Sequence, residues 1–288
     1  MDEVKLKDLL EAGCHFGHQA ARWNPKMKRY IFTARDNVHI FDLVKTKEGL
    51  EAAAEFAKKI VAEGGKVVLV GTKKQAKDLI KEAGIKTGMP YVSERWVGGT
   101  ITNWDKIKKN IENLIDLKEK KAAGEFKEYT KKENLLIDRQ INKLEYVYGG
   151  LVSLAGLPEA IFVIDVKREI GAVKEASGRN IPVIGVVDTN SDPDLVDLVI
   201  PANDDAAKSV HLIVDFLTQA LEEGNRLAEK IQKDKKAEEG REEKEKKAAE
   251  EEVIDEKFEK IEKKPVVEEI KTKKAKIMKV EDKESGKE

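Results

Sequence analysis

Apolar runs alternate with amphipathic segments through most of the chain. Three runs are almost continuously apolar, at 66–72 (KVVLVGT), 160–165 (AIFVID) and 182–188 (PVIGVVD). Strands that are buried on both faces have this character. Apolar residues at helical spacing predict helices over 45–63, 73–83 and 168–177 and a long one from residue 204. This alternation predicts an open parallel α/β sheet flanked by helices, with functional side chains at the carboxyl ends of its strands.

Shorter signals complete this prediction. Two strands around Asp36-Asn37, within residues 30–43, form a plausible hairpin, and further short strands are expected at 89–94 and 198–201. The second helix is expected to end at Gly84.

The segment from Trp104 to Tyr148 has a different pattern. Two apolar stripes recur at steps of three and four, separated by a polar connection around Gly124. They predict an antiparallel helical hairpin with a coiled-coil seam, inserted into the main body. The stripes comprise Ile107, Ile111 and Leu114, then Ile137, Ile141, Leu144 and Tyr148. We therefore expect an α/β domain formed by residues 1–104 and 149–228, a coiled-coil hairpin insertion at 105–148, and a charged tail at 229–288 that passes from helix to disorder.

The near-zero net charge of −1 conceals an asymmetry along the chain. Residues 1–156 contain 29 basic and 22 acidic side chains, residues 157–228 contain 6 and 13, and the remainder contains 19 and 20. The first part is thus the one expected to bind an anionic partner. A single cysteine, Cys14, suits a reducing compartment, and no apolar run is long enough for a membrane helix, so we expect a cytoplasmic protein without a membrane partner.

The most basic stretch is residues 13–32. It holds Arg22, Lys26, Lys28 and Arg29 with Trp23 and two histidines, and it has no acidic residue. Planar side chains between cations suit a surface that contacts phosphates and stacks on exposed bases. The alternative is an irregular lead-in whose Trp23 and Phe16 only cap a core, and the residues alone leave both open.

A second stretch, residues 93–104 (SERWVGGTITNW), combines two tryptophans with paired glycines. Gly98-Gly99 allows close backbone approach, and Arg95 and Asn103 can hydrogen-bond phosphate or sugar. A glycine turn packed under the base of the helical hairpin is the structural alternative, and both can hold together.

Enzymatic chemistry receives weaker support. The strands ending at Asp165 and Asp188 could form an acidic rim that holds a divalent cation. The favoured interpretation is that these polar residues cap turns and that Asp204 caps the last helix. Lys73 and Lys74 at a predicted helix N-terminus could bind a phosphate. The candidate metal ligands are His15, His18, Asp188, Asp204 and Asp205. No catalytic set emerges, and we expect neither an enzyme nor a cofactor.

Several motifs together resemble the bacterial small-subunit ribosomal protein S2 family. They are AGCHFGHQAARWNPKMKRYIFTARDNVHI, GGKVVLVGTKKQA, MPYVSERWVGGTITNW, GLPEAIFVIDV and IPVIGVVDTNSDPDLVDLVIPANDDA, in the family's order over roughly residues 3–225. The resemblance implies a flavodoxin-like domain with a protruding coiled-coil hairpin. It also implies a structural role in the small ribosomal subunit, between head and body, where the protein binds 16S ribosomal RNA and helps to anchor the large mRNA-binding ribosomal protein one.

Carried over position by position, the resemblance predicts a set of RNA-binding residues. With Arg29 added from the same basic stretch, the set is Arg22, Trp23, Asn24, Lys26, Lys28, Arg29, Lys73, Lys74, Arg95, Trp96 and Asn103. Two alternatives of other classes remain: a flavodoxin-like enzyme or phosphoacceptor that uses Asp165, Asp188 and Asp205, and an adaptor in which the coiled-coil hairpin is the working part.

Overall fold

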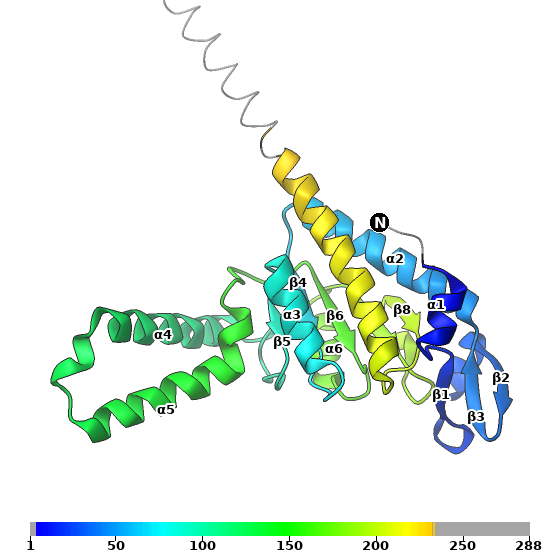
Figure 1. The fold of residues 1–288 in the computed structure, drawn as a ribbon, viewed down its shortest axis with the longest axis horizontal. Helices are drawn as coiled ribbons and strands as arrows, with labels where there is room; N and C mark the ends of the chain where they lie inside the picture. Colours follow the sequence, from blue (N-terminus) through cyan, green and yellow to red (C-terminus); the bar gives the residue numbers. More distant parts are fainter. Residues whose placement is uncertain (1–3, 232, 234–288) are drawn as a thin grey trace, which may run out of the picture. The chain divides into compact units, whose positions relative to one another are not determined.

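A parallel five-stranded sheet forms the centre of the described unit (Figure 1). The computed structural model describes residues 4–231 and 233, and the chain divides into two compact units, residues 1–229 and 230–288, of which we describe the first. The strands are β4 (Val67–Val70), β5 (Tyr91–Val92), β6 (Ala160–Ile164), β7 (Val183–Val187) and β8 (Leu198–Pro201). Their order, β5-β4-β6-β7-β8, is the 2-1-3-4-5 order of flavodoxin-like sheets. The predicted parallel α/β class is confirmed.

Both faces of this sheet are covered, which explains the continuous apolar runs. Every residue of β4, β6 and β7 is buried, and alternate side chains point into two separate cores. The first core lies against α1 (Leu6–Glu11), α2 (Leu43–Ala62), α3 (Lys77–Thr87) and a helix that begins at residue 207. The second lies against α6 (Ile170–Ser177), the buried residues of α4 (Trp104–Ala123) and α5 (Lys131–Tyr148), and Met27.

A small antiparallel sheet precedes the parallel one. It consists of β1 (Phe16–Gln19), β2 (Ile31–Arg35) and β3 (Val38–Phe41) in the order β1-β3-β2. Asp36 and Asn37 both have positive φ, 50° and 64°, as a two-residue hairpin turn requires, so the predicted hairpin is confirmed. Strand β1 was not predicted, because FGHQ has no apolar alternation and pairs with β3 in an irregular register. The 3-10 helices η1 (Ala20–Arg22) and η2 (Pro25–Tyr30) connect β1 to β2.

Two predicted helix boundaries are wrong for local reasons. Helix α3 begins at Lys77 and continues past Gly84 to Gly88, whose φ of 67° provides the left-handed cap. Gly84 instead permits close packing, since a Cβ there would lie 2.3 Å from the Tyr91 ring. The last helix begins at residue 207 rather than 204, because the Asn203 side chain accepts the backbone N–H groups of the next residues, including that of Asp205.

Helices α4 and α5 form the predicted helix pair. Ion pairs Lys118–Glu145 and Lys121–Asp138 join them and show that they run in opposite directions. Between them, η3 (Glu125–Glu128) follows a left-handed Gly124, and Thr130 opens α5 with a capping box. That the seam is a coiled coil, and that the pair is an insertion, stay predictions. No helix within residues 4–231 combines the length and apolarity needed to cross a membrane. The predicted charged tail comprises residues 229–288, and all of it beyond residue 233 lies outside the described residues.

Candidate functional site

The opening segment, which we define as residues 13–32, is fixed against the carboxyl edge of the parallel sheet. The backbone N–H groups of His18 and Asn24 donate to the hydroxyl and carbonyl oxygens of Thr189, at 2.8 and 2.7 Å. Gly17 permits this approach, because a Cβ there would lie 2.5 Å from the Thr189 methyl group. The segment is therefore a fixed part of the fold.

Two cations of the opening segment are paired within the protein. The Lys26 ammonium lies 2.7 Å from a carboxylate oxygen of Asp192 and 3.0 Å from one of Asp194, and Arg29 lies 3.2 Å from Asp194. The Asp192 hydrogen bond raises the pKa of Lys26, and Lys26 in turn lowers the pKa of Asp192. These carboxylates, from the loop after β7, compete with any phosphate for the two cations.

Other predicted cations have no internal counter-charge. Arg22, Lys28, Lys74 and Arg95 are exposed, and none of them forms a hydrogen bond or ion pair through its side chain with another residue in the described part of the chain. They remain free to neutralise phosphates.

The predicted aromatic and amide residues have different local roles. The Trp23 ring lies 4.9 Å from the ring of His39, and the Asn24 side chain accepts the N–H of Lys26 at 3.0 Å and so caps η2. Asn103 is exposed at the start of α4, where its side chain makes no capping hydrogen bond. Asn24 thus shapes the surface, whereas Asn103 is available to a partner.

Glu175, on α6, fixes the glycine loop at residues 95–103. Its carboxylate accepts four N–H groups at 2.8–3.2 Å, from the backbone of Gly99, Ile101 and Thr102 and from the indole of Trp96. Burial alone would raise the pKa of Glu175, but these hydrogen bonds outweigh burial and lower it. Arg179, one turn later, donates to the carbonyl of Thr102 at 2.9 Å. Sequence analysis missed Glu175, since nothing marks it within a predicted helix.

Lys73 is enclosed by carboxylates at the edge between β4 and β6. Its ammonium lies 3.3 Å from Asp165, 2.8 Å from Asp204 and 2.6 Å from Asp205. Burial would lower the pKa of Lys73, but the hydrogen bonds to Asp204 and Asp205 raise it. Helix α3 begins only at Lys77, so the predicted location of Lys73 at a helix N-terminus is wrong. A phosphate could reach this ammonium only by displacing a carboxylate.

Asp204 is the most deeply buried member of this cluster. Burial and the charges of Asp188 and Asp165 raise its pKa to about 7. One of its carboxylate oxygens has no hydrogen-bond partner within the described residues. Asp204 is therefore not the cap of the last helix, a role that Asn203 fills.

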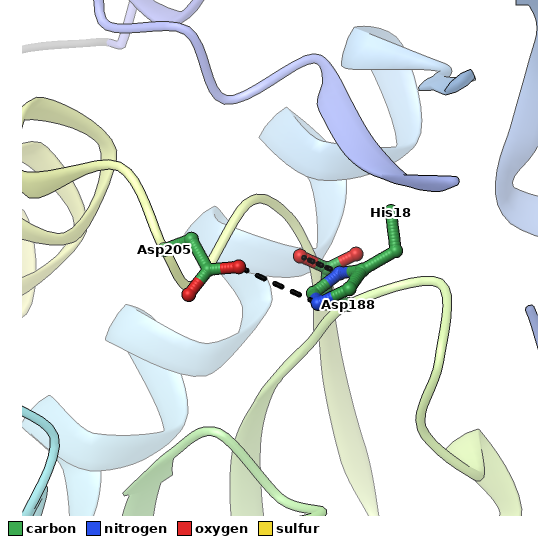
Figure 2. Close-up of side chains that lie close together, drawn as sticks. All are labelled: His18, Asp188 and Asp205. Atoms are coloured by element: carbon green, nitrogen blue, oxygen red, sulfur yellow. Dashed lines mark ion pairs between the residues drawn. The ribbon is translucent and has the colours of Figure 1, made fainter. Parts of the chain in front are cut away.

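Three of the five candidate metal ligands come together. His18, from β1, lies between Asp188, at the end of β7, and Asp205, after β8 (Figure 2). The ring nitrogens are 3.1 Å from Asp188 and 3.4 Å from Asp205, and the Asp188 hydrogen bond raises the pKa of His18. Imidazole and carboxylate groups in such a cluster could hold a divalent cation. His15 lies apart with its ring 3.9 Å from that of Phe16, and Asp204 binds Lys73 instead.

The geometry gives little support to the enzymatic alternative. Asp165 and Asp205 are both paired with Lys73, and Asp188 accepts hydrogen bonds from Thr189. The Cys14 thiol is fully buried, which raises its pKa and makes it a poor nucleophile.

Comparison with known proteins gives one consistent result. A family model described as "Ribosomal protein S2" matches residues 9–224. Two curated relatives named "Small ribosomal subunit protein uS2", from Roseiflexus sp. (strain RS-1) and Roseiflexus castenholzii (strain DSM 13941 / HLO8), are each 49% identical over 231 residues. Each alignment covers 80% of this chain and 88% of the relative.

Proposed function

Because the chain belongs to the ribosomal protein S2 family, we propose that it is a non-enzymatic structural constituent of the small ribosomal subunit, located in the cytoplasm. In this proposal it binds 16S ribosomal RNA between the head and body of the subunit. The observation that supports the RNA contact is the presence of unpaired cations beside planar side chains on two fixed segments, residues 13–32 and 95–103.

The predicted RNA-binding residues, on these two segments and on the loop after β4 that holds Lys73 and Lys74, divide by role. Arg22, Lys28, Lys74 and Arg95 supply phosphate contacts, since no internal carboxylate neutralises them. Lys26, Arg29 and Lys73 act mainly through internal ion pairs that hold the surface in shape. The remaining members of the set are aromatic or amide residues of the same surface: Trp23, Asn24, Trp96 and Asn103.

The charge of the opening segment can be reversed without disturbing an internal contact. We expect the double variant Arg22→Glu, Lys28→Glu to keep the stability of the wild type and to enter small subunits poorly, because phosphate contacts are lost and repulsion replaces them. Co-sedimentation of the tagged protein with small subunits in sucrose gradients, at low and high salt and with ribonuclease, measures this.

A matched control carries the same change of charge elsewhere. The double variant Lys59→Glu, Lys81→Glu reverses two exposed cations on α2 and α3, the helices that pack on the first core. This variant should enter small subunits normally. Normal incorporation of the Arg22, Lys28 variant would refute the assignment of the opening segment. Free sedimentation of the wild type under all conditions would refute the ribosomal role itself.

We further propose that the small antiparallel sheet helps to recruit the large mRNA-binding ribosomal protein one. The support is the exposure of two aromatic residues of this sheet: Phe32 is 76% exposed and Phe16 is 49% exposed. A hollow of about 270 Å³ is lined by Phe32, Leu10 and Val44, among others. Apolar groups around a hollow suit a short protein segment with an aromatic anchor.

The test is the amount of ribosomal protein one retained on purified subunits. Phe32→Ser should reduce it several-fold while the subunits still contain this protein. Ile85→Ser, which removes an apolar residue that is 66% exposed on α3, should leave this amount unchanged. Equal retention in both variants would refute this surface as the recruitment site.

A further inference from the structure

A hollow of about 360 Å³ lies between the glycine loop and the base of the helix pair, and no role has yet been assigned to it. Its volume is in the range of sites that hold one small planar ligand. It is lined by Arg95, Trp96, Val97, Gly98, Asn110, Lys143, Leu144, Val147 and Tyr148. The hollow thus combines an apolar floor and aromatic walls with two cations.

Charge decides which kind of ligand fits. The lining includes no carboxylate, and within the described residues neither the Arg95 nor the Lys143 side chain forms an ion pair or hydrogen bond. A groove of about 750 Å³ beside α1 offers a contrast: its lining includes the three carboxylates of Asp8, Glu11 and Asp215 against the single ammonium of Lys208, which disfavours a phosphate. The smaller hollow therefore favours an anionic ligand with an aromatic ring.

The walls of the hollow are held in place before any ligand arrives. The Trp96 indole donates to Glu175 at 3.1 Å, which fixes the plane of its ring. The Asn110 amide donates to the Tyr148 hydroxyl at 3.2 Å, across the bases of α4 and α5. Preorganised aromatic walls lower the entropic cost of binding a planar group.

We propose that this hollow is a nucleotide pocket, which accepts one unstacked base of ribosomal RNA while Arg95 and Lys143 bind the adjacent phosphates. This rests on the proposed function and deepens it, since it defines a single-stranded or bulged RNA element as the ligand. Proteins read RNA chiefly where bases are unpaired and can stack on aromatic or guanidinium planes. The Asn110 amide oxygen, which has no hydrogen-bond partner in the described part, can accept an amino group of the base.

A substitution at Gly98 can fill the pocket and leave its two cations unchanged. It lines the hollow, its φ is not positive, and a Cβ there would meet no atom within 4 Å. Gly98→Leu therefore adds bulk at the pocket without backbone strain and leaves both cations in place. Gly156→Leu is the matched control, because Gly156 has the same freedom and lies outside the pocket.

The experiment assembles small subunits from 16S ribosomal RNA, the other ribosomal proteins and the full-length chain as wild type, Gly98→Leu or Gly156→Leu. Short-wave ultraviolet light then cross-links stacked aromatic side chains to bases, and chemical probes report the exposure of each nucleotide. In the wild type and Gly156→Leu we expect a cross-link from the peptide carrying Trp96 or Tyr148 to one nucleotide. Gly98→Leu should lose the cross-link, expose that nucleotide, and weaken binding by about tenfold, as expected for one stacked base.

The possible failures are distinguishable. Absence of the wild type from the subunits would overturn the proposed function, and the pocket with it. Normal incorporation of all three proteins without a cross-link from the Trp96 or Tyr148 peptides, or with one that Gly98→Leu retains, would overturn the pocket alone. Loss of a neighbouring ribosomal protein from the Gly98→Leu particle, with unchanged nucleotide exposure, would assign the hollow to a protein segment and overturn the proposal.

Discussion

At the scale of single residues, the partner of a charged group decides its role. Lys73 and Lys74 are adjacent in sequence and have opposite environments. Lys73 is 13% exposed and touches three carboxylates, whereas Lys74 is exposed and has no partner in the described part of the chain. The same distinction separates Lys26, which is paired, from Lys28, which is not. A count of cations therefore overstates the charge available to RNA.

Glu175 shows the reverse case, in which a carboxylate holds together the glycine loop that we propose binds RNA. We expect Glu175→Gln to destabilise the protein by about 1–3 kcal/mol at neutral pH, because an amide cannot accept all the N–H groups that the carboxylate accepts. Since the folded pKa of Glu175 is lowered, its contribution is present above the ordinary value of 4.5 and is lost as the pH falls through the lowered folded pKa. Urea unfolding of both proteins across this pH range measures the difference.

Glu112→Gln is the control for this measurement. Glu112 is exposed on α4 with a single ion pair to Lys108 at 4.0 Å, so its replacement should change stability little at any pH. A Glu175 variant as stable as the Glu112 variant would show that the carboxylate does not hold the glycine loop.

At the scale of elements, glycines set how closely the edge strand β5 is packed. Gly84 on α3 and Gly150 after α5 both touch Tyr91, and a Cβ at Gly150 would lie 2.2 Å from the Tyr91 carbonyl oxygen. The helix pair is thus joined to the sheet by direct contact between two backbones, directly after α5 ends. That junction lies next to the proposed nucleotide pocket, whose wall includes Tyr148.

A methyl group at this junction should be costly. We expect Gly150→Ala to lower the free energy of unfolding by about 1–3 kcal/mol, because the contacted atom is backbone and cannot rotate away. Gly156→Ala, in open space, should have no such cost. Thermal unfolding of the two variants beside the wild type measures this, and equal melting temperatures would show that the backbones separate freely.

How well the elements could be predicted depended on where their stabilisation originates. Buried strands can be recognised from the sequence as continuous apolar runs, because both faces of β6 and β7 must be apolar. The end of α3 cannot be placed from the sequence, because Gly84 and Gly88 are both glycines that could end a helix. Only the structure shows that Gly84 packs against Tyr91 within the helix and that Gly88 is the cap. Strand β1 is stabilised by pairing with β3 and by Thr189, to which its own residues give no clue.

The candidate site was predictable to a similar extent. The rule that parallel strands end at one edge predicts that Asp165, Asp188 and Asp205 lie near one another, and the structure places His18 within reach of Asp188 and Asp205. Sequence could not show that Lys73 occupies the middle of this rim, because its partners come from two loops far apart in sequence, Asp165 after β6 and Asp204 and Asp205 after β8. Nor could it show the proposed nucleotide pocket, which is lined by the glycine loop and by residues of both helices of the pair.

At the scale of the whole described unit, the two oppositely charged parts of the chain meet. The acidic residues that follow β7 and β8 bind the basic opening segment and Lys73. Part of the charge asymmetry seen along the sequence is therefore neutralised by ion pairs within the protein. Among the predicted RNA-binding cations, Arg22, Lys28, Lys74 and Arg95 stay unpaired within the described residues, on the opening segment, the loop after β4 and the glycine loop.

The helix pair raises the question of where the cooperative core ends. The buried side chains of α4 stop at Leu114, and those of α5 begin at Ile141, so the outer half of the pair contributes no fully buried residue to the second core. We therefore propose that this half is dispensable for folding. Replacing residues 119–140 with about six Gly and Ser residues, which span roughly 13 Å, suits the ~10 Å between packed helices. It also preserves the Lys118–Glu145 ion pair.

We expect this shortened protein to melt within about 4 °C of the wild type, which corresponds to about 1 kcal/mol in a chain of this size. Its loss of helical circular dichroism should match the residues removed. Leu114→Ala is the contrasting variant: Leu114 is fully buried at the base, and its truncation should cost about 2–5 kcal/mol. Should the shortened protein instead melt as low as the Leu114 variant, the outer half would belong to the cooperative core, because its few interhelical contacts would then stabilise the base from which both helices extend.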